Sequence, residues 1–319
     1  MTAFPYATVE VVRSGFVESV HAGSAVVLAP SGQVLAAAGD PDAPMLPRSA
    51  NKPLQLVGML RAGLALPPPD LAVCASSHSG EPAHVGRVLD LLAGAGVPPS
   101  ALVCPPALPL DEAAAAGIVR AGGGPERVTM NCSGKHTALL LTCVANGWPL
   151  AGYAEPDHPV QVAIRAAVED LAGQPVTAVA VDGCGAPLFG LSLAGLARAF
   201  ARLATAEPGT PERAVADAMR AHPDLVGGTG RDVTQLMTGA PGVLAKDGAE
   251  GVFAAATPDG AAVAVKVADG TGRARTPLLV GALRRVGVHA AVLNALAEAP
   301  VLGGGHPVGS IRLAGDAWV

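Results

Sequence analysis

Segments with the alternating pattern of β-strands lie near both ends of this chain, and the long segment between them has the pattern of helices. Residues 9–38 alternate between turn signals such as Pro30-Ser31-Gly32, which is typical of an antiparallel meander. Alternation returns over residues 242–267, where Ala249-Glu250-Gly251 and Pro258-Asp259-Gly260 fit hairpin turns. We therefore predict an α+β fold in which N- and C-terminal strands build one antiparallel sheet.

The middle of the chain is predicted to be mainly helical. The helical segments are Pro53–Leu64, His84–Ala95, Asp111–Val119, Lys135–Ala145, Val160–Leu171, Leu191–Leu203 and Pro211–Met219. Another such stretch, Pro277–Leu296 with a break at Gly287, precedes a Gly-rich tail. We expect one domain, 1–319, with two lobes: a sheet lobe from 1–47 and 240–319, and a helical lobe from 48–239. Catalytic groups would lie in the cleft between the lobes.

Composition excludes several classes of protein. Only 15% of the 319 residues are charged, and the net charge of −5 argues against nucleic-acid binding. Apolar runs such as Ala138–Ala145 are far shorter than the roughly 20 residues of a membrane-spanning helix, and residues 1–20 do not resemble a secretory leader. Five cysteines, an odd number, favour a reducing compartment, so we expect a cytoplasmic protein. The scarcity of charge favours an oligomer, which we expect to be a homodimer.

Lysine is rare in this chain, and its positions are informative. There are four lysines among the 21 basic residues, so arginine supplies the ordinary surface cations. Positions that keep lysine are candidates for sites where an amine must lose its proton or bind as a compact charge. Drift in nucleotide composition is the alternative explanation for any one of them.

The first lysine belongs to the segment Arg48-Ser49-Ala50-Asn51-Lys52, which precedes an apolar helical run. Residues three apart on a helix share a face, so the Ser49 hydroxyl and the Lys52 amine can meet. A hydroxyl becomes a good nucleophile when a base removes its proton, and an amine can do so once its pKa is lowered. A simple N-cap serine beside a solvated lysine is the alternative.

Cys74-Ala75-Ser76-Ser77-His78-Ser79-Gly80-Glu81 gathers hydroxyls, an imidazole and a carboxylate directly after an apolar run. Loops in that position often present reactive groups. An ordinary Ser/Gly turn explains the composition equally well. Spacing alone does not decide which of the serines takes part in chemistry.

Two further segments each place a cysteine beside glycine and polar groups. They are Asn131-Cys132-Ser133-Gly134-Lys135-His136 and Asp182-Gly183-Cys184-Gly185. Two thiolates from separate loops, with a nitrogen or oxygen donor and a water, would satisfy a tetrahedral zinc ion. Cys132 and Lys135 can share a helical face, and Asp182 can orient a ligand or hold a substrate amine. The alternatives are buried free cysteines, or a Cys132 nucleophile with His136 as its base.

Lys266 interrupts an alternating strand of small and β-branched residues, Val263 to Ala268. It shares a strand face with Ala264 and Ala268, which leave room for a group to approach it. An edge-strand lysine that blocks pairing with other chains is the alternative. Lys246, in a turn-rich segment, is expected to be a solvated surface residue.

In chain order these motifs, together with Gly228-Thr229-Gly230-Arg231, resemble the rhizobial-type (class 3) L-asparaginase family over residues 9–269. The resemblance implies a fold similar to serine β-lactamases and penicillin-binding proteins, and hydrolysis of L-asparagine to L-aspartate and ammonia. It implies two Ser-Lys pairs, Ser49 with Lys52 and Ser77 with Lys266. It also implies one Zn²⁺ per chain. The implied metal ligands are Cys132, Lys135 and Cys184, with Arg48, His136 and Asp182 near the substrate.

The reaction expected from these residues is acyl transfer through a serine ester, with a neutral lysine as the base. Two competing functions remain open at this stage. One is a penicillin-recognising serine hydrolase, although Lys266-Val267-Ala268 lacks the Lys-Thr-Gly pattern of those enzymes. The other is a non-catalytic, zinc-stabilised binding protein. The expected substrate is a small molecule, with neither nucleic acid nor membrane as partner.

Overall fold

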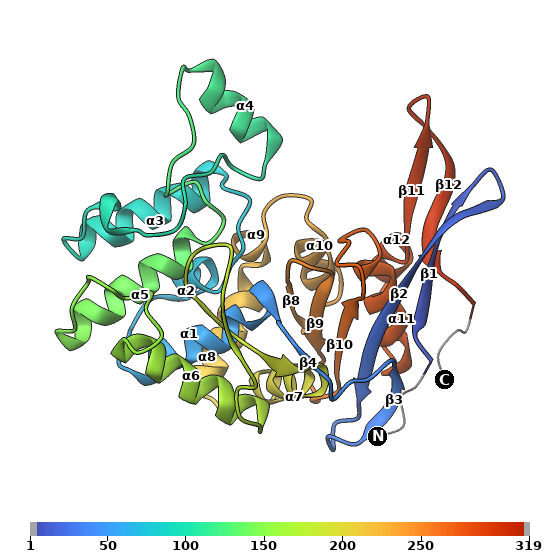
Figure 1. Ribbon diagram of the computed structural model, residues 1–319, viewed down its shortest axis with the longest axis horizontal. Helices are drawn as coiled ribbons and strands as arrows, with labels where there is room; N and C mark the ends of the chain where they lie inside the picture. Colours follow the sequence, from blue (N-terminus) through green and yellow to red (C-terminus); the bar gives the residue numbers. More distant parts are fainter. Residues whose placement is uncertain (1–4, 316–319) are drawn as a thin grey trace.

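The computed structural model describes residues 5–315, so both ends of the expected domain and the first residues of the segment compared with a leader lie outside the described part. The predicted fold class is confirmed, because strands from both ends of the chain form one antiparallel sheet (Figure 1). The strand order is β11-β12-β1-β2-β10-β9-β8, and β3 also pairs with β2. These strands are β1 (Ala7–Arg13), β2 (Phe16–Leu28), β3 (Val34–Ala38), β8 (Leu244–Asp247), β9 (Val252–Ala256), β10 (Ala262–Val267), β11 (Glu298–Gly303) and β12 (His306–Leu313).

The sheet differs from the predicted meander at two places. Phe16–Leu28 is one long strand, which pairs with β1 along its first half and with β3 and β10 along its second half. The Gly-rich tail is a β-hairpin, β11–β12, whose turn contains Gly304 and Gly305 at φ of 57° and 83°. Glycine adopts these left-handed conformations without the steric cost that a side chain brings.

The segment between the sheet strands supplies most of the helices. In chain order the helices are η1 (Arg48–Asn51), α1 (Lys52–Arg61), α2 (Pro68–Cys74), α3 (Pro82–Gly94), η2 (Pro99–Ala101), α4 (Glu112–Arg120), α5 (Ser133–Asn146), α6 (Pro159–Ala172), α7 (Leu193–Ala204), α8 (Pro211–Ala221), α9 (Pro223–Val226), α10 (Asp232–Gly239), α11 (Arg275–Arg285) and α12 (Val292–Leu296). Two small pairs, β4 (Pro44–Met45) with β7 (Leu191–Ser192) and β5 (Val179–Val181) with β6 (Pro187–Phe189), lie among them. The predicted break at Gly287 separates α11 from α12.

Helices cover the middle of the sheet. Both α7 and α11 contact β2, β9 and β10. Every side chain of β9 is buried, and so is nearly every side chain of β10. Because successive strand residues point to opposite faces, this pattern means that both faces of these strands are covered. No helix in residues 5–315 is long and apolar enough to cross a membrane.

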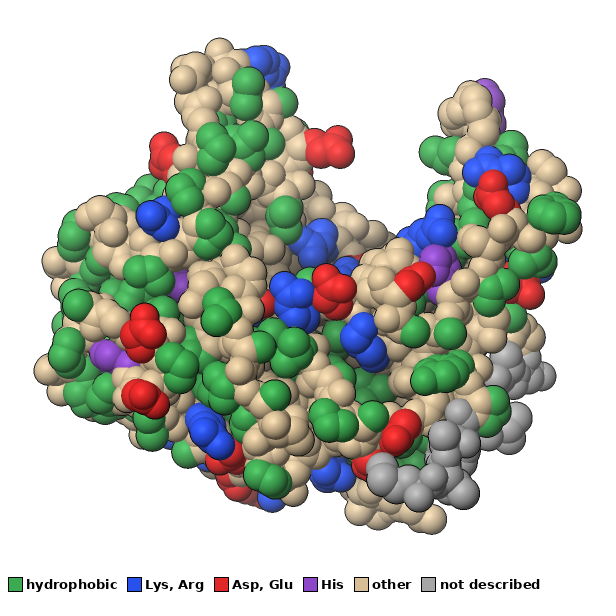
Figure 2. All heavy atoms as spheres, in the orientation of Figure 1, with side chains coloured by type: hydrophobic (Ala, Val, Ile, Leu, Met, Phe, Trp, Pro, Cys, Tyr) green, Lys and Arg blue, Asp and Glu red, His purple; other side chains and the backbone are tan. Residues whose placement is uncertain are grey.

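The last strand of the sheet path, β8, connects the sheet to the helical layer. It packs against η1 and α10, and η1 leads directly into α1. The other end of the sheet, with the β1–β2 turn and the β11–β12 hairpin, extends away from the body as an arm (Figure 1). The segment with α4 extends on the opposite side, and the surface is hollowed between the two (Figure 2).

Candidate active site

The amine of Lys52 lies at the meeting point of three segments that are distant in sequence. Lys52 is the first residue of α1 and is 1% exposed. Its Nζ donates to the Ser76 carbonyl oxygen at 2.6 Å, to Ser77 Oγ at 2.9 Å and to Cys132 Sγ at 3.0 Å. Lys52 therefore connects the serine-rich loop after α2 with the cysteine at the start of α5.

Hydrogen bonding distinguishes the serines of that loop. Ser76 Oγ donates to the Val73 carbonyl oxygen, and Ser79 Oγ donates to the Gly227 carbonyl oxygen. Their hydroxyls thus hold the loop in place. Ser77 is the serine of this loop whose hydroxyl contacts a lysine amine, and its Oγ keeps a hydrogen free to donate.

Ser77 also lines a pocket of about 180 Å³, and Ser49 lines the same pocket. Beside the two serines, its walls are Asn131, Arg231, Asp247, Gly248, Ala249 and Arg275. Two hydroxyls, an amide and two guanidinium groups facing one small space can bind a polar molecule the size of an amino acid.

Ser49 and Lys52 do not form the expected hydrogen-bonded pair. Ser49 lies on the 3₁₀ turn η1, where its carbonyl oxygen accepts from the Lys52 backbone N–H, but no hydrogen bond joins its hydroxyl to Lys52 Nζ in the described part of the chain. The Lys52 side chain instead points into the core, where Ser76, Ser77 and Cys132 supply its acceptors. The structure thus brings Lys52 to Ser77, while Ser49 faces the pocket.

Arg48, directly before Ser49, has a left-handed backbone with φ of 49°, which is uncommon for a residue other than glycine. Its Nε donates to Asp182 Oδ1 at 2.8 Å. Burial raises the pKa of Asp182, but nearby Lys135 and the hydrogen bond from Arg48 outweigh it, so the pKa is lowered and the carboxylate stays ionised. Arg48 and Asp182, both predicted near the substrate, therefore form an ion pair next to Ser49.

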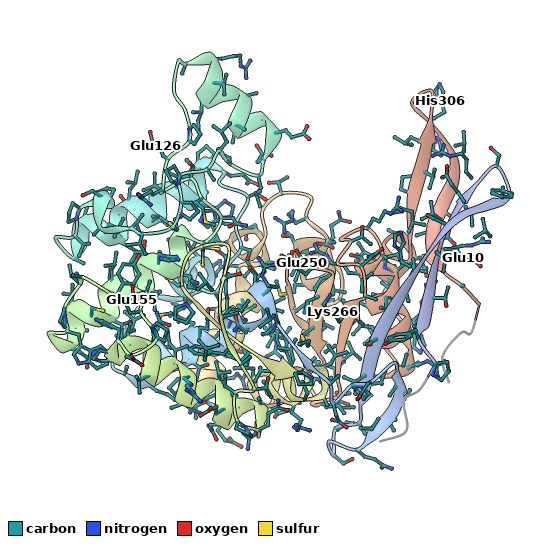
Figure 3. The ribbon with its side chains drawn as sticks, viewed as in Figure 1. Glu10, Glu126, Glu155, Glu250, Lys266 and His306 are labelled. Carbon is teal, nitrogen blue, oxygen red and sulfur yellow. The ribbon has the colours of Figure 1, made fainter. Side chains whose placement is uncertain are left out.

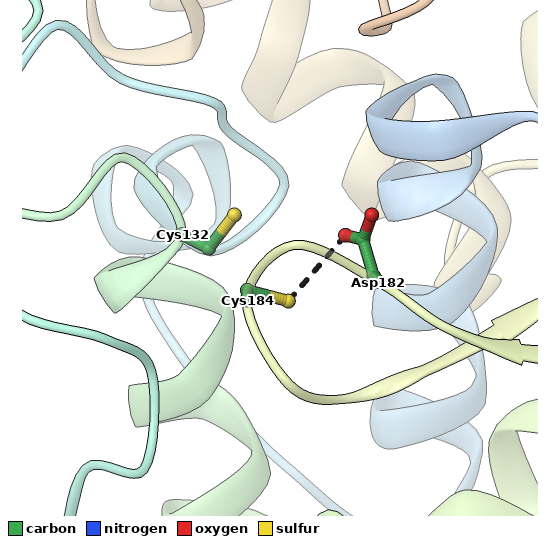
Figure 4. A group of neighbouring side chains, drawn as sticks. All are labelled: Cys132, Asp182 and Cys184. Atoms are coloured by element: carbon green, nitrogen blue, oxygen red, sulfur yellow. Dashed lines mark hydrogen bonds between the residues drawn. The ribbon is translucent and has the colours of Figure 1, made fainter.

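Asp182, Cys132 and Cys184 form a compact cluster, which we call the thiol cluster (Figure 4). One ligand atom from each lies within 4.8 Å of the others, and the Cys184 Sγ donates to Asp182 Oδ2 at 3.4 Å. Lys135 Nζ donates to Cys184 Sγ at 3.0 Å, so the predicted ligand lysine lies beside the cluster. Both cysteines and Lys135 are buried.

The two thiols of this cluster have shifted pKa values, in opposite directions. Hydrogen bonding with Cys184 and the charges of Lys52 and Lys135 lower the pKa of Cys132 to about 5, although burial opposes this. The same contact with Cys132, together with burial, raises the pKa of Cys184. Cys143 on the same helix has no such neighbours, and burial raises its pKa to about 11. A thiolate at neutral pH is therefore expected at Cys132.

His136 lies next to the cluster with one ring nitrogen engaged. Its Nδ1 is 2.8 Å from the Tyr153 hydroxyl, and its buried Nε2 has no hydrogen-bond partner in the part of the chain that the structure describes. Burial lowers the pKa of His136 to about 4, so the ring is neutral. Together, the two sulfurs, the carboxylate and this unsatisfied nitrogen are the kinds of donor that zinc prefers, and they fit the ion, whereas, despite burial, the neighbouring thiols raise the pKa of Lys135, so its amine would have to lose a proton to join them.

The structure places Lys266 away from Ser77. Lys266 lies on β10 (Figure 3). Its Nζ donates to the Val267 carbonyl oxygen at 2.6 Å, and it lines a separate pocket with Tyr6, Ser24 and Asp40. No hydrogen bond connects it to Ser77 within residues 5–315. The pairing of Ser77 with Lys266 is thus not formed here, because β10 directs this side chain to another groove.

Lys246 lies next to the site and is buried, although the sequence predicts a solvated surface residue. It is 0% exposed, and burial together with the charge of nearby Lys52 lowers its pKa to about 8, despite opposition from Asp247. Lys246 Nζ donates to the Asp247 carbonyl oxygen at 2.8 Å and to Asp247 Oδ1 at 2.6 Å. A Cβ on Gly248, the residue directly after β8, would lie 2.8 Å from the Pro47 carbonyl oxygen and 3.1 Å from the Ala50 nitrogen, so the chain at the end of β8 lies directly against η1.

A pattern in the sequence could have identified Lys246. Lys246-Asp247-Gly248 is a Lys-x-Gly segment at the end of a strand, and it is closer to the Lys-Thr-Gly pattern than Lys266-Val267-Ala268 is. Asp247 between them is buried and accepts hydrogen bonds from Lys246, Arg231 and Arg275. These cations hold the pKa of Asp247 well below its usual range, against the effect of burial.

Comparisons with known proteins add the following. A family model described as L-asparaginase II matches residues 9–313. A search of the curated proteins finds no match. Among solved structures, Mglu in its native form has 15% identity and a TM-score of 0.41 over 78% of this chain, which covers 60% of that protein.

Two other solved structures are similar at the same level. A Bacillus glutaminase has 12% identity and a TM-score of 0.43, over 78% of this chain and 84% of its own. A β-lactamase from Mycobacterium bovis has 18% identity and a TM-score of 0.43, over 86% of this chain and 93% of its own. The match over residues 9–313 includes every motif discussed above, and the chain belongs to the L-asparaginase II family.

Proposed function

We propose that this protein is an amidohydrolase that converts L-asparagine to L-aspartate and ammonia. The observation that carries this proposal is the 2.9 Å contact between Lys52 Nζ and Ser77 Oγ at the wall of a small polar pocket. A hydroxyl within hydrogen-bond reach of an amine is the arrangement of a nucleophile with its base. Membership of the L-asparaginase II family supports an amide as the substrate.

In the proposed reaction, neutral Lys52 takes the proton of Ser77, and the alkoxide attacks the side-chain amide carbon. The nitrogen leaves as ammonia after it has received a proton, and water then hydrolyses the aspartyl ester. Lys52 has three acceptors around Nζ, which suit the three hydrogens of an ammonium group. For Lys52 to act as the base, one of these hydrogens must first pass as a proton to water in the pocket that Ser77 lines.

We assign the second amine of the site to Lys246 in place of Lys266. Lys246 is buried on β8, a strand that packs against η1, and its pKa of about 8 leaves a neutral fraction near neutral pH. Its Nζ donates to Asp247, which lines the pocket together with Ser49. Lys246 and Ser49 would form the second amine and hydroxyl pair, whereas no hydrogen bond within residues 5–315 joins Lys266 to either serine.

Asp182 is proposed to hold the α-ammonium group of the substrate. Its carboxylate is ionised and belongs to the thiol cluster, with one oxygen bonded to Arg48. An ammonium group pairs well with a partly buried carboxylate. His136, neutral and buried, would help to keep this side of the site in place.

A zinc ion is proposed to be held by Cys132, Lys135 and Cys184. Bound there, it would supply positive charge that orders the loops and attracts the substrate's polar groups. Lys135 would have to bind as a neutral amine.

The five cysteines are all free and buried, which supports the reducing, cytoplasmic location expected from the sequence.

Ammonia release tests the activity. Purified protein is incubated with L-asparagine, L-glutamine and a chromogenic β-lactam, and we expect ammonia from L-asparagine and no β-lactam hydrolysis. Ser77→Ala and Ser49→Ala should each lower kcat by about 10²-fold or more. The matched control is Ser76→Ala, because the Ser76 hydroxyl bonds to the Val73 carbonyl oxygen. The kcat of this variant should stay near that of the unaltered protein. A folded protein that releases no ammonia would contradict the proposal.

Peptide mapping of a trapped acyl-enzyme identifies the nucleophile. We expect the added mass on the peptide that contains Ser77. An adduct on Ser49 instead would make Ser49 the nucleophile and Ser77 a hydroxyl that passes its proton to Lys52.

Metal analysis tests the zinc proposal. We expect about one zinc per chain in the unaltered protein and a large loss in Cys184→Ser. Cys143→Ala is the matched control, because this thiol lies on α5 outside the thiol cluster. Equal zinc content in Cys184→Ser and the unaltered protein would refute the ligand set.

We also propose that the chain forms a homodimer. Large apolar side chains on the arm are exposed, including Phe16 at 73% and Leu302 at 55%. Their burial against a second copy would remove an apolar surface from water. Sedimentation analysis should give twice the mass of 31.4 kDa, and a monomer at micromolar concentration would contradict the proposal.

A further inference from the structure

The segment Gly228-Thr229-Gly230-Arg231 is fixed to the loop that carries Ser77. The backbone N–H of Thr229 donates to Glu81 at 2.6 Å, and the Thr229 hydroxyl donates to the other oxygen of the same carboxylate. A Cβ at Gly228, where φ is 121°, would lie 2.4 Å from Ser79 Oγ. The close approach requires glycine, and it sets the position of Arg231 relative to Ser77.

Arg231 lines the pocket, and some of its N–H groups are free to bind a ligand. Its Nη2 donates to Asp247 Oδ2 at 2.7 Å, which holds the guanidinium in place. Its Nε and Nη1 have no protein acceptor among the residues described. A guanidinium has five N–H donors, and two of them can bind both oxygens of one carboxylate.

The neighbouring Arg275 lines the same pocket but has its nitrogens occupied. Its Nε and Nη2 donate to Asp232, its Nη1 donates to the Gly248 carbonyl oxygen, and Nη2 also contacts Asp247. Arg275 therefore supports the wall of the pocket. Of the two arginines, Arg231 is the one available to a ligand.

The charge around the pocket favours an anionic group. Arg231 and Arg275 balance Asp247 and Asp232 in number, and the buried amine of Lys246 adds positive charge beside them. Asp182, in the thiol cluster, is ionised and accepts from Arg48, the residue next to the pocket serine Ser49. A cationic and an anionic side chain near one pocket match the two charged groups of a free amino acid.

We propose that Arg231 binds the α-carboxylate of the substrate and thereby restricts the enzyme to free amino acids, excluding asparagine within peptides or with an amidated α-carboxyl group. This inference rests on the proposed function. It adds the carboxylate-binding residue and the chemical class of substrate that the residue selects.

The test combines a truncated side chain with truncated substrates. Succinamic acid is L-asparagine without its amino group, and 3-aminopropanamide is L-asparagine without its α-carboxylate. Arg231→Gln should lower kcat/KM by about 10²-fold for L-asparagine and for succinamic acid, because a desolvated charge pair is lost. For 3-aminopropanamide, which has no carboxylate to lose, the change should stay within about 3-fold.

Two further variants serve as controls. Arg231→Lys keeps the charge without the planar fork and should give an intermediate loss. Arg165→Gln removes an exposed arginine on α6 and should leave all three substrates unaffected. An equal loss for all three substrates in Arg231→Gln would overturn the proposal, since Arg231 would then act only on Asp247. No loss for L-asparagine would overturn it as well.

Two measurements separate this inference from the proposed activity. If Arg231→Gln does not fold, the unaltered enzyme decides: equal kcat/KM for L-asparagine and L-asparagine α-amide overturns the proposal, and a loss of about 10²-fold supports it. If the unaltered protein hydrolyses no amide, calorimetry with L-aspartate is used. Binding that is lost in Arg231→Gln and kept in Arg165→Gln then supports the Arg231 site alone, and binding that is equal in both contradicts it.

Discussion

Two strands of the same sheet each carry one lysine near their C-terminal end, and the two lysines have very different surroundings. Lys246 on β8 is 0% exposed and lies against η1, whereas Lys266 on β10 is about half-buried and reaches a surface groove. β8 is an edge strand, but η1 and α10 pack against it. β10 is an inner strand whose end opens toward Tyr6 and Asp40. Position within a sheet therefore does not determine which lysine is buried.

The aspartates that follow the two lysines also differ in burial. Asp247 is 3% exposed and joins Lys246, Arg231 and Arg275 into one ion-pair cluster. Asp269, three residues after Lys266, has a side chain that is 50% exposed and accepts from His21 at 2.6 Å. A buried charge cluster keeps the amine of Lys246 in place, and the half-buried Lys266 has no such cluster around it among the residues described. Paired substitutions on the two strands can test this contrast.

The largest difference is expected in catalysis. Lys246→Met should lower kcat by about 10³-fold, because the second amine of the site is removed, while Lys266→Met should keep it within about 3-fold. Ammonia release from L-asparagine measures both. The reverse result would restore Lys266 to the site and remove Lys246.

Stability should differ next. Asp247→Asn leaves buried cations without their partner and should cost about 3–5 kcal/mol of the free energy of unfolding. Asp269→Asn changes a mostly exposed contact and should cost less than about 1 kcal/mol. Urea unfolding of both variants measures this, and equal costs would show that the cluster at β8 is not structurally important.

The glycine after Asp247 gives a smaller effect. Gly248→Ala forces the 2.8 Å approach to the Pro47 carbonyl oxygen to relax, which should cost about 1–3 kcal/mol and shift η1. Ala268→Ser, at the exposed position that follows β10, should stay within about 0.5 kcal/mol. Thermal unfolding compares them. A Gly248→Ala variant as stable as the unaltered protein would mean that β8 and η1 are farther apart than described.

The smallest expected effect is in the pH dependence. Because the pKa of Lys246 is lowered to about 8, its neutral form increases as pH rises through that value. The kcat/KM should then rise with pH and level off above about 8, with a value at pH 7 near one tenth of the plateau. Lys266→Met should show the same profile. A flat profile from pH 6 to 9 would remove Lys246 as a base.

Most of the fold could be predicted from local patterns. The amphipathic helices begin and end within a few residues of the predicted bounds, because their caps and apolar spacing are local features. The hairpin β11–β12 was not predicted, because its Gly-rich sequence has few strand-forming residues and its stability comes from pairing with β1. The continuity of β2 over Phe16–Leu28 could not be predicted, since β10, which pairs with its second half, lies far away in the sequence.

The site could be predicted only in part. Ser77, Lys52 and the thiol cluster come together from the motifs that marked them. Lys246 was missed because its immediate neighbours resemble a turn, and its burial comes from η1, two hundred residues earlier. No role could be predicted for Arg231 from the sequence. Its guanidinium is positioned by Asp247, which also accepts from Arg275, and both of these residues come from other elements.

The left-handed backbone of Arg48 implies that stability and function favour different residues at this position. Glycine or asparagine would adopt that conformation with less strain, by about 1 kcal/mol. Either replacement would remove the guanidinium that Asp182 binds. A library that is screened for heat resistance should therefore enrich small residues at position 48, while one screened for turnover should keep arginine.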